Sequence, residues 1–156
     1  MTLENIYQAV KAITADEKGN SQYSTLNEMQ IAIKPENLLC AVETLLNNGV
    51  RHLSTITGCY EGKQLTLLYH FWKKEGFTLR IYLEQGKQEI HTITELIPGA
   101  AFYEREVAEM FGIQINGLDT SQKLFLPDNW QGDAPMHTDF RTTENNDTEN
   151  KEKGEK

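Results

Sequence analysis

Apolar residues recur at two spacings along the first part of the chain, and the spacing predicts where helices and strands lie. Near the N-terminus they fall every three or four residues, as on one face of a helix: Leu3, Ile6, Tyr7, Val10 and Ile13. We therefore predict a helix over roughly residues 3–16, with a stop at Gly19. Residues 29–34 alternate between apolar and polar side chains, which predicts a strand. A second helix follows, with Pro35 at its start and Gly49 at its end.

The next part of the chain carries three strand-like segments separated by short polar ones. Residues 52–57 predict a strand that ends in a turn over residues 58–63. Residues 64–72 form the strongest strand pattern, and residues 73–76 read as a turn before a third strand at residues 77–83. Connections this short favour antiparallel pairing of neighbouring strands.

A helical pattern returns after the polar stretch EQGKQ. Residues 91–96 fit either a short helical turn or a strand, and Pro98 then interrupts the pattern. Residues 100–111 predict a helix that stops at Gly112 and continues into a β-like segment.

From Ile113 to Phe140 the chain shows little periodicity, and isolated apolar residues stand in a polar background. These anchors are Ile115, Leu118, Leu124, Phe125, Leu126 and Trp130. The pattern predicts an extended arm that lies along another surface. Residues 141–156 contain no large apolar residue and are predicted to be disordered. We therefore divide the chain into a domain over residues 1–112, a partner-binding arm over 113–140 and a polar tail over 141–156.

The order of predicted elements indicates the fold class. Helix, strand, helix, three strands, helix and arm together predict an α+β fold, with helices packed on one face of a mixed β-sheet and an extended C-terminal arm.

Composition then narrows the function. A net charge of −8 and a pI of about 5.0 argue against binding to nucleic acid or an anionic membrane surface. The N-terminus does not resemble a signal peptide, and no apolar run is long enough to suggest insertion into a membrane. Cys40 lies in an apolar helical pattern and is expected to be buried, whereas Cys59 is expected in a turn. A reducing, cytoplasmic compartment is therefore the default.

Motifs for cofactor chemistry are missing from the sequence. The four histidines show no metal-binding spacing, two separated cysteines cannot bind an iron–sulfur cluster, and no glycine-rich phosphate loop or nucleophile motif is found. We therefore expect no catalytic residue, no cofactor and no metal in this chain.

One helix concentrates charge: Glu104, Arg105, Glu106 and Glu109. Three interpretations are open. The helix could be a solvated face with an Arg105–Glu109 pair, which would contribute a few tenths of a kcal/mol. Its carboxylates could instead be an acid/base pair for hydrolysis, or the helix could dock onto a partner protein.

The segment EREVAEMFGIQINGL resembles the signature of the thirty-kilodalton subunit of respiratory complex I, the NADH-quinone oxidoreductase. The matching residues are Glu104, Arg105, Glu106, Phe111, Gly112, Ile113 and Gly117. Glu109 replaces an aspartate of the signature, and Leu118 stands where the family often has histidine. The resemblance extends over residues 36–140 and is most specific at 94–117.

This resemblance implies a non-catalytic subunit without a redox cofactor. Such a subunit packs against a large catalytic subunit (the quinone-site subunit, or its hydrogenase counterpart) and near a small iron–sulfur subunit, on the cytoplasmic side of the cell membrane. Iron–sulfur clusters, and nickel–iron in a hydrogenase, would then belong to the partner subunits. The same family occurs in complex I, in energy-converting nickel–iron hydrogenases and in related ferredoxin- or deazaflavin-linked complexes, and the sequence fits each of them.

The implied partner interface combines the charged helix with apolar anchors and the arm: Phe102, Glu104, Arg105, Glu106, Glu109, Phe111, Gly112, Gly117, Leu124, Leu126, Pro127, Trp130, Pro135 and Asp139. Two family segments rich in positive charge read here as Gln122-Lys123 and Met136-His137-Thr138-Asp139, which suggests a different partner surface. The alternative from another class is a stand-alone soluble hydrolase that uses the carboxylates of Glu104, Glu106 or Glu109.

Overall fold

The computed structural model describes residues 3–13, 23–25, 28–62, 64–84 and 86–137. Four predictions lie outside these residues: the extension of the first helix to residue 16, its stop at Gly19, the disorder of the polar tail and the interface role of Asp139.

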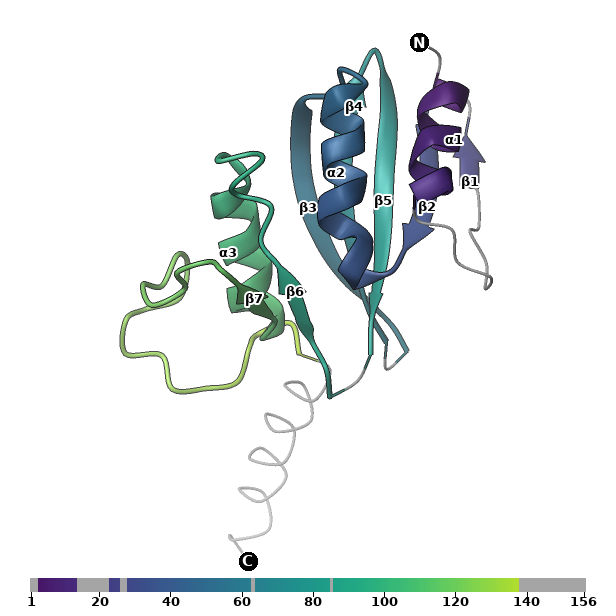
Figure 1. Ribbon diagram of the computed structural model, residues 1–156. Helices are drawn as coiled ribbons and strands as arrows, with labels where there is room; N and C mark the ends of the chain where they lie inside the picture. Colours follow the sequence, from purple (N-terminus) through teal and green to yellow (C-terminus); the bar gives the residue numbers. More distant parts are fainter. Residues whose placement is uncertain (1–2, 14–22, 26–27, 63, 85, 138–156) are drawn as a thin grey trace, which may run out of the picture.

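A five-stranded sheet forms the body of the fold. Its strands are β1 (Tyr23–Thr25), β2 (Glu28–Ile33), β3 (His52–Glu61), β4 (Gln64–Lys73) and β5 (Glu75–Leu83). They lie in the order β1-β2-β5-β4-β3 (Figure 1). The β2–β5 pair is parallel, whereas the other three pairs are antiparallel. The sheet is therefore mixed, as the sequence predicted.

Both turns of the β3–β4–β5 meander are tighter than predicted. The ladder between β3 and β4 continues to the pair Glu61↔Gln64, so Gly58 and Cys59 lie in a strand and not in a turn. The ladder between β4 and β5 likewise continues to Lys73↔Glu75 around Lys74, which takes the positive φ of 62° that this turn requires. The predicted turns were too long because polar residues near a turn still pair across the strands.

The helices cover one face of the sheet. Helix α1 (Leu3–Ile13), the 3-10 helix η1 (Pro35–Asn37) and α2 (Leu38–Asn47) lie over it (Figure 1). Burial largely alternates along the strands, which places every second side chain in the core. The core strand residues are Met29, Ile31, Ile33, Leu53, Ile56, Leu65, Leu67, Tyr69, Phe71, Phe77, Leu79, Ile81 and Leu83. Cys40 was expected to be buried but is exposed, because α2 turns its neighbours Ala41 and Val42 toward the core instead.

A smaller layer lies beside the edge strand β3. Strand β6 (Glu89–His91) pairs in parallel with β7 (Gln114–Asn116), and helix α3 (Ala100–Phe111) connects them and packs on β3 (Figure 1). Gly112 ends α3 with a left-handed φ of 72°. Residues 113–116, predicted as the start of the arm, thus belong to this layer.

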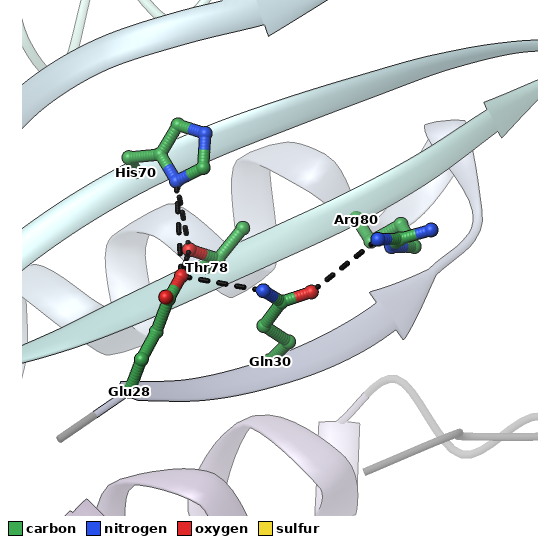
Figure 2. A network of polar contacts seen from close by, with 5 residues as sticks. All are labelled: Glu28, Gln30, His70, Thr78 and Arg80. Atoms are coloured by element: carbon green, nitrogen blue, oxygen red, sulfur yellow. Dashed lines mark hydrogen bonds and ion pairs between the residues drawn. The ribbon is translucent and has the colours of Figure 1, made fainter. Parts of the chain in front are cut away.

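The opposite face of the main sheet has a polar character. Residues one position out of phase with the core point to it, including Glu28 and Gln30 on β2, His70 on β4 and Thr78 and Arg80 on β5 (Figure 2). The helices lie on the other face, so Glu28 and His70, whose side chains are 37% and 28% exposed, are accessible from outside the chain. Thr78 is buried beneath them.

Candidate partner-binding site

Helix α3 is amphipathic, and one of its charged residues, Glu104, lies on the buried face. The buried positions are Ala100, Glu104, Val107 and Phe111, which recur at helical spacing and face the core. A carboxylate in such a stripe needs hydrogen-bond donors to offset the loss of water.

Glu104 finds both donors in the segment that follows β6. Its Oε2 accepts a hydrogen bond from the Thr92 hydroxyl at 2.5 Å, and its Oε1 accepts one from the backbone N–H of Ile93 at 2.8 Å. The side chain has no exposed surface, and this burial raises the pKa of Glu104 against the opposing effect of the two hydrogen bonds. Glu104 therefore ties α3 to the smaller sheet and is not available to a partner, unlike the interface role expected for it.

Arg105 and Glu109 attach the arm to the outer side of α3. Arg105 Nη2 donates to the carbonyl of Gln122 at 2.8 Å. The two carboxylate oxygens of Glu109 accept from the backbone N–H groups of Leu124 at 3.0 Å and Phe125 at 2.7 Å. Each side chain thus binds arm backbone, and not the other side chain as the i,i+4 spacing suggested.

The pKa of Glu109 reflects this attachment. Burial would raise it, but hydrogen bonds from the backbone amides of Phe125, Leu124 and Leu126, together with the charge of Lys123, lower the pKa of Glu109 below its usual value. The carboxylate is therefore ionised at neutral pH, when it binds the arm amides most strongly.

A carboxylate that acts as a general acid in hydrolysis needs both access to a substrate and a raised pKa, and here these two properties belong to different residues. A cleft of about 130 Å³ lies between α3 and the arm, and it includes Arg105 and Glu109. Glu109 is reachable, but its pKa is lowered and both its oxygens are engaged. Glu104 has the raised pKa of a general acid but no exposed surface. Neither Glu104 nor Glu109 therefore combines access with the raised pKa that a general acid needs.

The remaining predicted interface residues divide between core, arm and surface. Phe111 was expected to be an interface anchor, but it is only 7% exposed and packs against Tyr60 with ring centroids 6.0 Å apart. Phe102 is 65% exposed. Gly112 and Gly117 both have a positive φ, at 72° and 89°.

Along the arm, exposure varies from residue to residue. Leu124, Leu126, Trp130 and Pro135 are half-buried, as is Glu106 on α3, whereas Pro127 is exposed. Trp130 Nε1 donates to the carbonyl of Asp133 at 3.2 Å, which folds the arm locally. At the far end, the N–H of Met136 donates to the carbonyl of Met110 at 2.8 Å and returns the arm to α3.

Sequence reasoning missed the partners of these charges and a polar network on the open sheet face. Ile93 and Gln122 bind these charged groups through backbone atoms, so their side-chain types give no signal in the sequence. Thr92 binds through its hydroxyl, but only the fold brings it to Glu104. The network on the sheet does leave a weak signal, because His70 and Thr78 stand at polar positions of otherwise apolar strands.

Metal ligands and membrane spans were both considered in the sequence. In the part of the chain that the structure describes, no three His, Cys, Asp or Glu side chains gather closely enough to hold a metal ion. None of the described helices combines the length and apolar character needed to cross a bilayer.

Comparisons with known proteins match most of the chain. Residues 31–146 match the family described as respiratory-chain NADH dehydrogenase, 30 Kd subunit. NAD(P)H-quinone oxidoreductase subunit J of Prochlorococcus marinus (strain NATL1A) is 30% identical over 122 residues, which cover 70% of each chain. The corresponding subunit J of Prochlorococcus marinus (strain MIT 9211) is 28% identical over 122 residues, 70% of this chain and 67% of that one.

A third relative is a longer protein. The NADH-quinone oxidoreductase C/D protein of Acidiphilium cryptum is 36% identical over 98 residues, which cover 58% of this chain but 16% of that one.

Solved structures share the fold. One, from the membrane-bound sulfane sulfur reductase, an archaeal respiratory membrane complex, aligns with a TM-score of 0.72 at 16% identity and covers 93% of this chain and 91% of that chain. A trypsin-resistant fragment of Nqo5 aligns with a TM-score of 0.64 at 23% identity and covers 76% of this chain and 98% of that chain. The match over residues 31–146, which includes the whole of α3 with its Glu-Arg-Glu sequence, shows that the chain belongs to the 30 kDa subunit family of the respiratory-chain NADH dehydrogenase.

Proposed function

We propose that this chain is a non-catalytic, cofactor-free subunit in the peripheral arm of a membrane-associated, ion-pumping electron-transfer complex. It docks onto the large catalytic subunit through the outer side of α3 and the arm, and it lies near the small iron–sulfur subunit. The observation that carries the proposal is the attachment of the arm to α3 by Arg105 and Glu109, which leaves two phenylalanines exposed beside it.

The exposed phenylalanines supply the apolar part of this surface. Phe102 on α3 and Phe125 on the arm are 65% and 64% exposed, and Phe102 and Glu109 lie on the same side of the helix because they are seven residues apart. Burying one such ring in an interface contributes about 1.5–3 kcal/mol, and aromatic side chains are often the residues that dominate affinity.

The large subunit is the favoured partner for two reasons. The resemblance to the thirty-kilodalton subunit implies it, and the name of the Acidiphilium relative joins C with D in one protein of which the match covers 16%. A fusion of this kind fits two subunits that lie next to each other in an assembly. Iron–sulfur clusters and any nickel–iron centre would then belong to the partner subunits, and the complex would hold this chain at the cytoplasmic side of the membrane.

Purification of the tagged full chain from its native membranes in mild detergent tests this function. We expect a large catalytic subunit and a small cluster-bearing subunit to be recovered with it. Metal analysis of the large subunit then separates a nickel–iron hydrogenase from a quinone reductase. Recovery of the chain alone would contradict the proposal.

Charge reversal at Arg105 tests the surface itself. Arg105→Glu removes the bond to Gln122 and puts a third carboxylate beside Glu106 and Glu109, so the arm loosens and recovery of the large subunit should fall about tenfold. Arg51→Glu, at an exposed position away from α3, is the matched control and should change nothing. Circular dichroism should show both variants folded. Unfolding of Arg105→Glu would make Arg105 an internal structural residue, and unchanged recovery would place the interface elsewhere.

A further inference from the structure

A cleft lined by both polar and apolar side chains lies on the open face of the main sheet, away from α3 and the arm. It has a volume of about 370 Å³, near the lower end of the range for ligand pockets, and its lining includes Glu28, Ser54, His70, Trp72 and Thr78. Trp72 is 51% exposed, so the indole is available to a group that enters. The cleft can hold a single side chain better than an extended substrate.

The hydrogen bonds at its base determine which proton His70 carries. The Thr78 hydroxyl donates its one proton to Glu28 Oε1 at 2.7 Å, so at its 2.9 Å contact with His70 Nδ1 it must accept. Nδ1 is therefore the protonated nitrogen, and Nε2, on the other side of the ring in Figure 2, offers a lone pair. Burial lowers the pKa of His70, although the charge of Glu28 opposes the change, which favours this neutral form.

Glu28 has one oxygen engaged and one available. Within the described residues its bonds from Thr78 and from Gln30 Nε2, at 2.7 and 3.3 Å, both reach Oε1 (Figure 2). Its carboxylate stands 3.9 Å from His70 Nδ1, and the side chain is 37% exposed. The cleft thus combines a carboxylate oxygen, an imidazole lone pair and an aromatic face, and all three attract a cation that can donate hydrogen bonds.

We propose that this cleft receives an arginine side chain presented by a neighbouring subunit, with the guanidinium stacked on Trp72 and donating to Glu28 Oε2 and His70 Nε2. A planar guanidinium with several donors matches a flat ring and two separate acceptors better than the compact ammonium of lysine does. A basic occupant also complements the net charge of −8. The identity of the occupant as a subunit rests on the proposed function, whereas the chemistry of the cleft does not.

The first test uses the isolated full chain and nuclear magnetic resonance of the His70 ring and the Trp72 indole. N-acetyl-arginine amide should shift both signals saturably with millimolar affinity, and N-acetyl-citrulline amide, a neutral isostere, should not. Glu28→Gln and Trp72→Ala should each weaken binding at least about tenfold. Glu36→Gln and Leu39→Ala remove an exposed acid and an exposed apolar side chain outside both proposed surfaces, and should leave the binding unchanged. The site would be overturned if the arginine probe did not saturate it, if the citrulline probe bound equally well, or if Glu28→Gln bound the arginine probe as tightly as the wild type.

The second test identifies the occupant in the assembled complex. A photoreactive benzoylphenylalanine placed at position 54, which lines the cleft but makes none of the proposed contacts, should cross-link to an arginine-containing segment of another subunit. An assembled complex that cross-links elsewhere, or not at all, would overturn this inference and leave the proposed function intact. If native membranes instead yield the chain alone, still able to bind the arginine probe, a subunit as occupant is overturned together with the proposed function.

Discussion

At the scale of single residues, Glu104 shows how a signature carboxylate can serve the fold. It lies in the buried stripe of α3, and its two oxygens meet the hydroxyl of Thr92 and the N–H of Ile93. Removing the carboxylate would leave the buried N–H of Ile93 without its acceptor, whereas the Thr92 hydroxyl keeps Thr94 Oγ1 at 2.8 Å as a second partner. A buried donor without an acceptor costs more than the loss of one exposed hydrogen bond. The Glu-Arg-Glu sequence therefore carries two different roles in adjacent positions, one internal and one at the arm.

Substitution of Glu104 should separate its hydrogen bonds from its charge. Glu104→Ala should lower the free energy of unfolding by about 2–4 kcal/mol, since it leaves the Ile93 N–H unpaired, removes one partner of the Thr92 hydroxyl and opens a cavity. Glu104→Gln keeps the shape and an acceptor for Ile93, and should cost much less. Denaturant unfolding of the full chain measures both. An equal cost for the two variants would show that the negative charge itself is required.

A comparison of the wild-type protein with Glu104→Gln at several pH values should reveal the protonation of Glu104. Because its pKa is raised in the folded state, the protonated form stabilises the fold at pH values below the ordinary 4.5, and this advantage is lost as the pH rises through the folded pKa. The stability of the wild-type protein relative to Glu104→Gln should therefore decrease from acidic toward neutral pH. A constant difference across that range, measured by denaturant titration at several pH values, would contradict the raised pKa.

At the scale of elements, α3 depends on a close approach to strand β3. A Cβ built on Gly58 would lie 2.5 Å from Cε2 of Phe111, a ring that is buried and has little room to move. Gly58→Ala should therefore displace α3 and cost about 1–3 kcal/mol of stability. Gly99→Ala is the matched control, because no atom lies within 4 Å of its Cβ and its φ of −64° suits any residue.

A second substitution makes the contact itself testable. If the clash with Phe111 is the cause, Gly58→Ala should cost less in a Phe111→Leu background, so that the two losses are not additive. Additive losses would show that Gly58 is needed for a reason other than the ring.

The elements were predictable to different degrees. The helix at residues 100–111 was predicted with both its ends because an apolar stripe and Gly112 give the same boundary. Glu104 falls on the same side as Val107 and Phe111, so the spacing already placed it in the core, but its charge outweighed the spacing in our interpretation. Strand β7 was too short to show alternation, and its pairing with β6 spans more than twenty intervening residues.

The site was harder to predict than the fold. Arm attachments through Gln122, Leu124 and Phe125 use backbone groups, which every residue has. The network on the open face requires that β2 lie beside β5, and the bond from Thr78 to Glu28 joins residues fifty positions apart. Neither the strand order nor that distance follows from local patterns.

At the scale of the whole molecule, α3 connects three parts that are distant in sequence. Helix α3 lies beside the smaller sheet, strand β3 and the arm (Figure 1). It contacts the segment after β6 through Glu104, strand β3 through Phe111 and the arm through Arg105 and Glu109. The arm is therefore held in one place by the chain itself over residues 122–125. A preordered arm reduces the entropy lost when a partner binds.

Hydrogen exchange should measure how firmly the arm is held. Glu109→Gln removes the charge and one acceptor oxygen, so exchange of the Leu124 and Phe125 amides should speed up about tenfold, as expected for losing roughly 1.5 kcal/mol. Amides within α3 should not change. Glu106→Gln, one turn away on the same helix, is the control and should leave the arm amides as they are. Unchanged exchange in Glu109→Gln would mean that other contacts hold the arm.

Attachment through backbone groups has a consequence for how the protein can change. Since the hydrogen bonds from Arg105 and Glu109 to the arm reach main-chain atoms, the side chains at positions 122, 124 and 125 can be exchanged without removing these bonds. Lys123, whose charge lies near Glu109, is the neighbour that such exchange would affect most. Attachment of the arm and recognition of a partner thus depend on different atoms. The same fold can therefore be adapted to a new assembly by substituting a few solvent-facing residues of the arm.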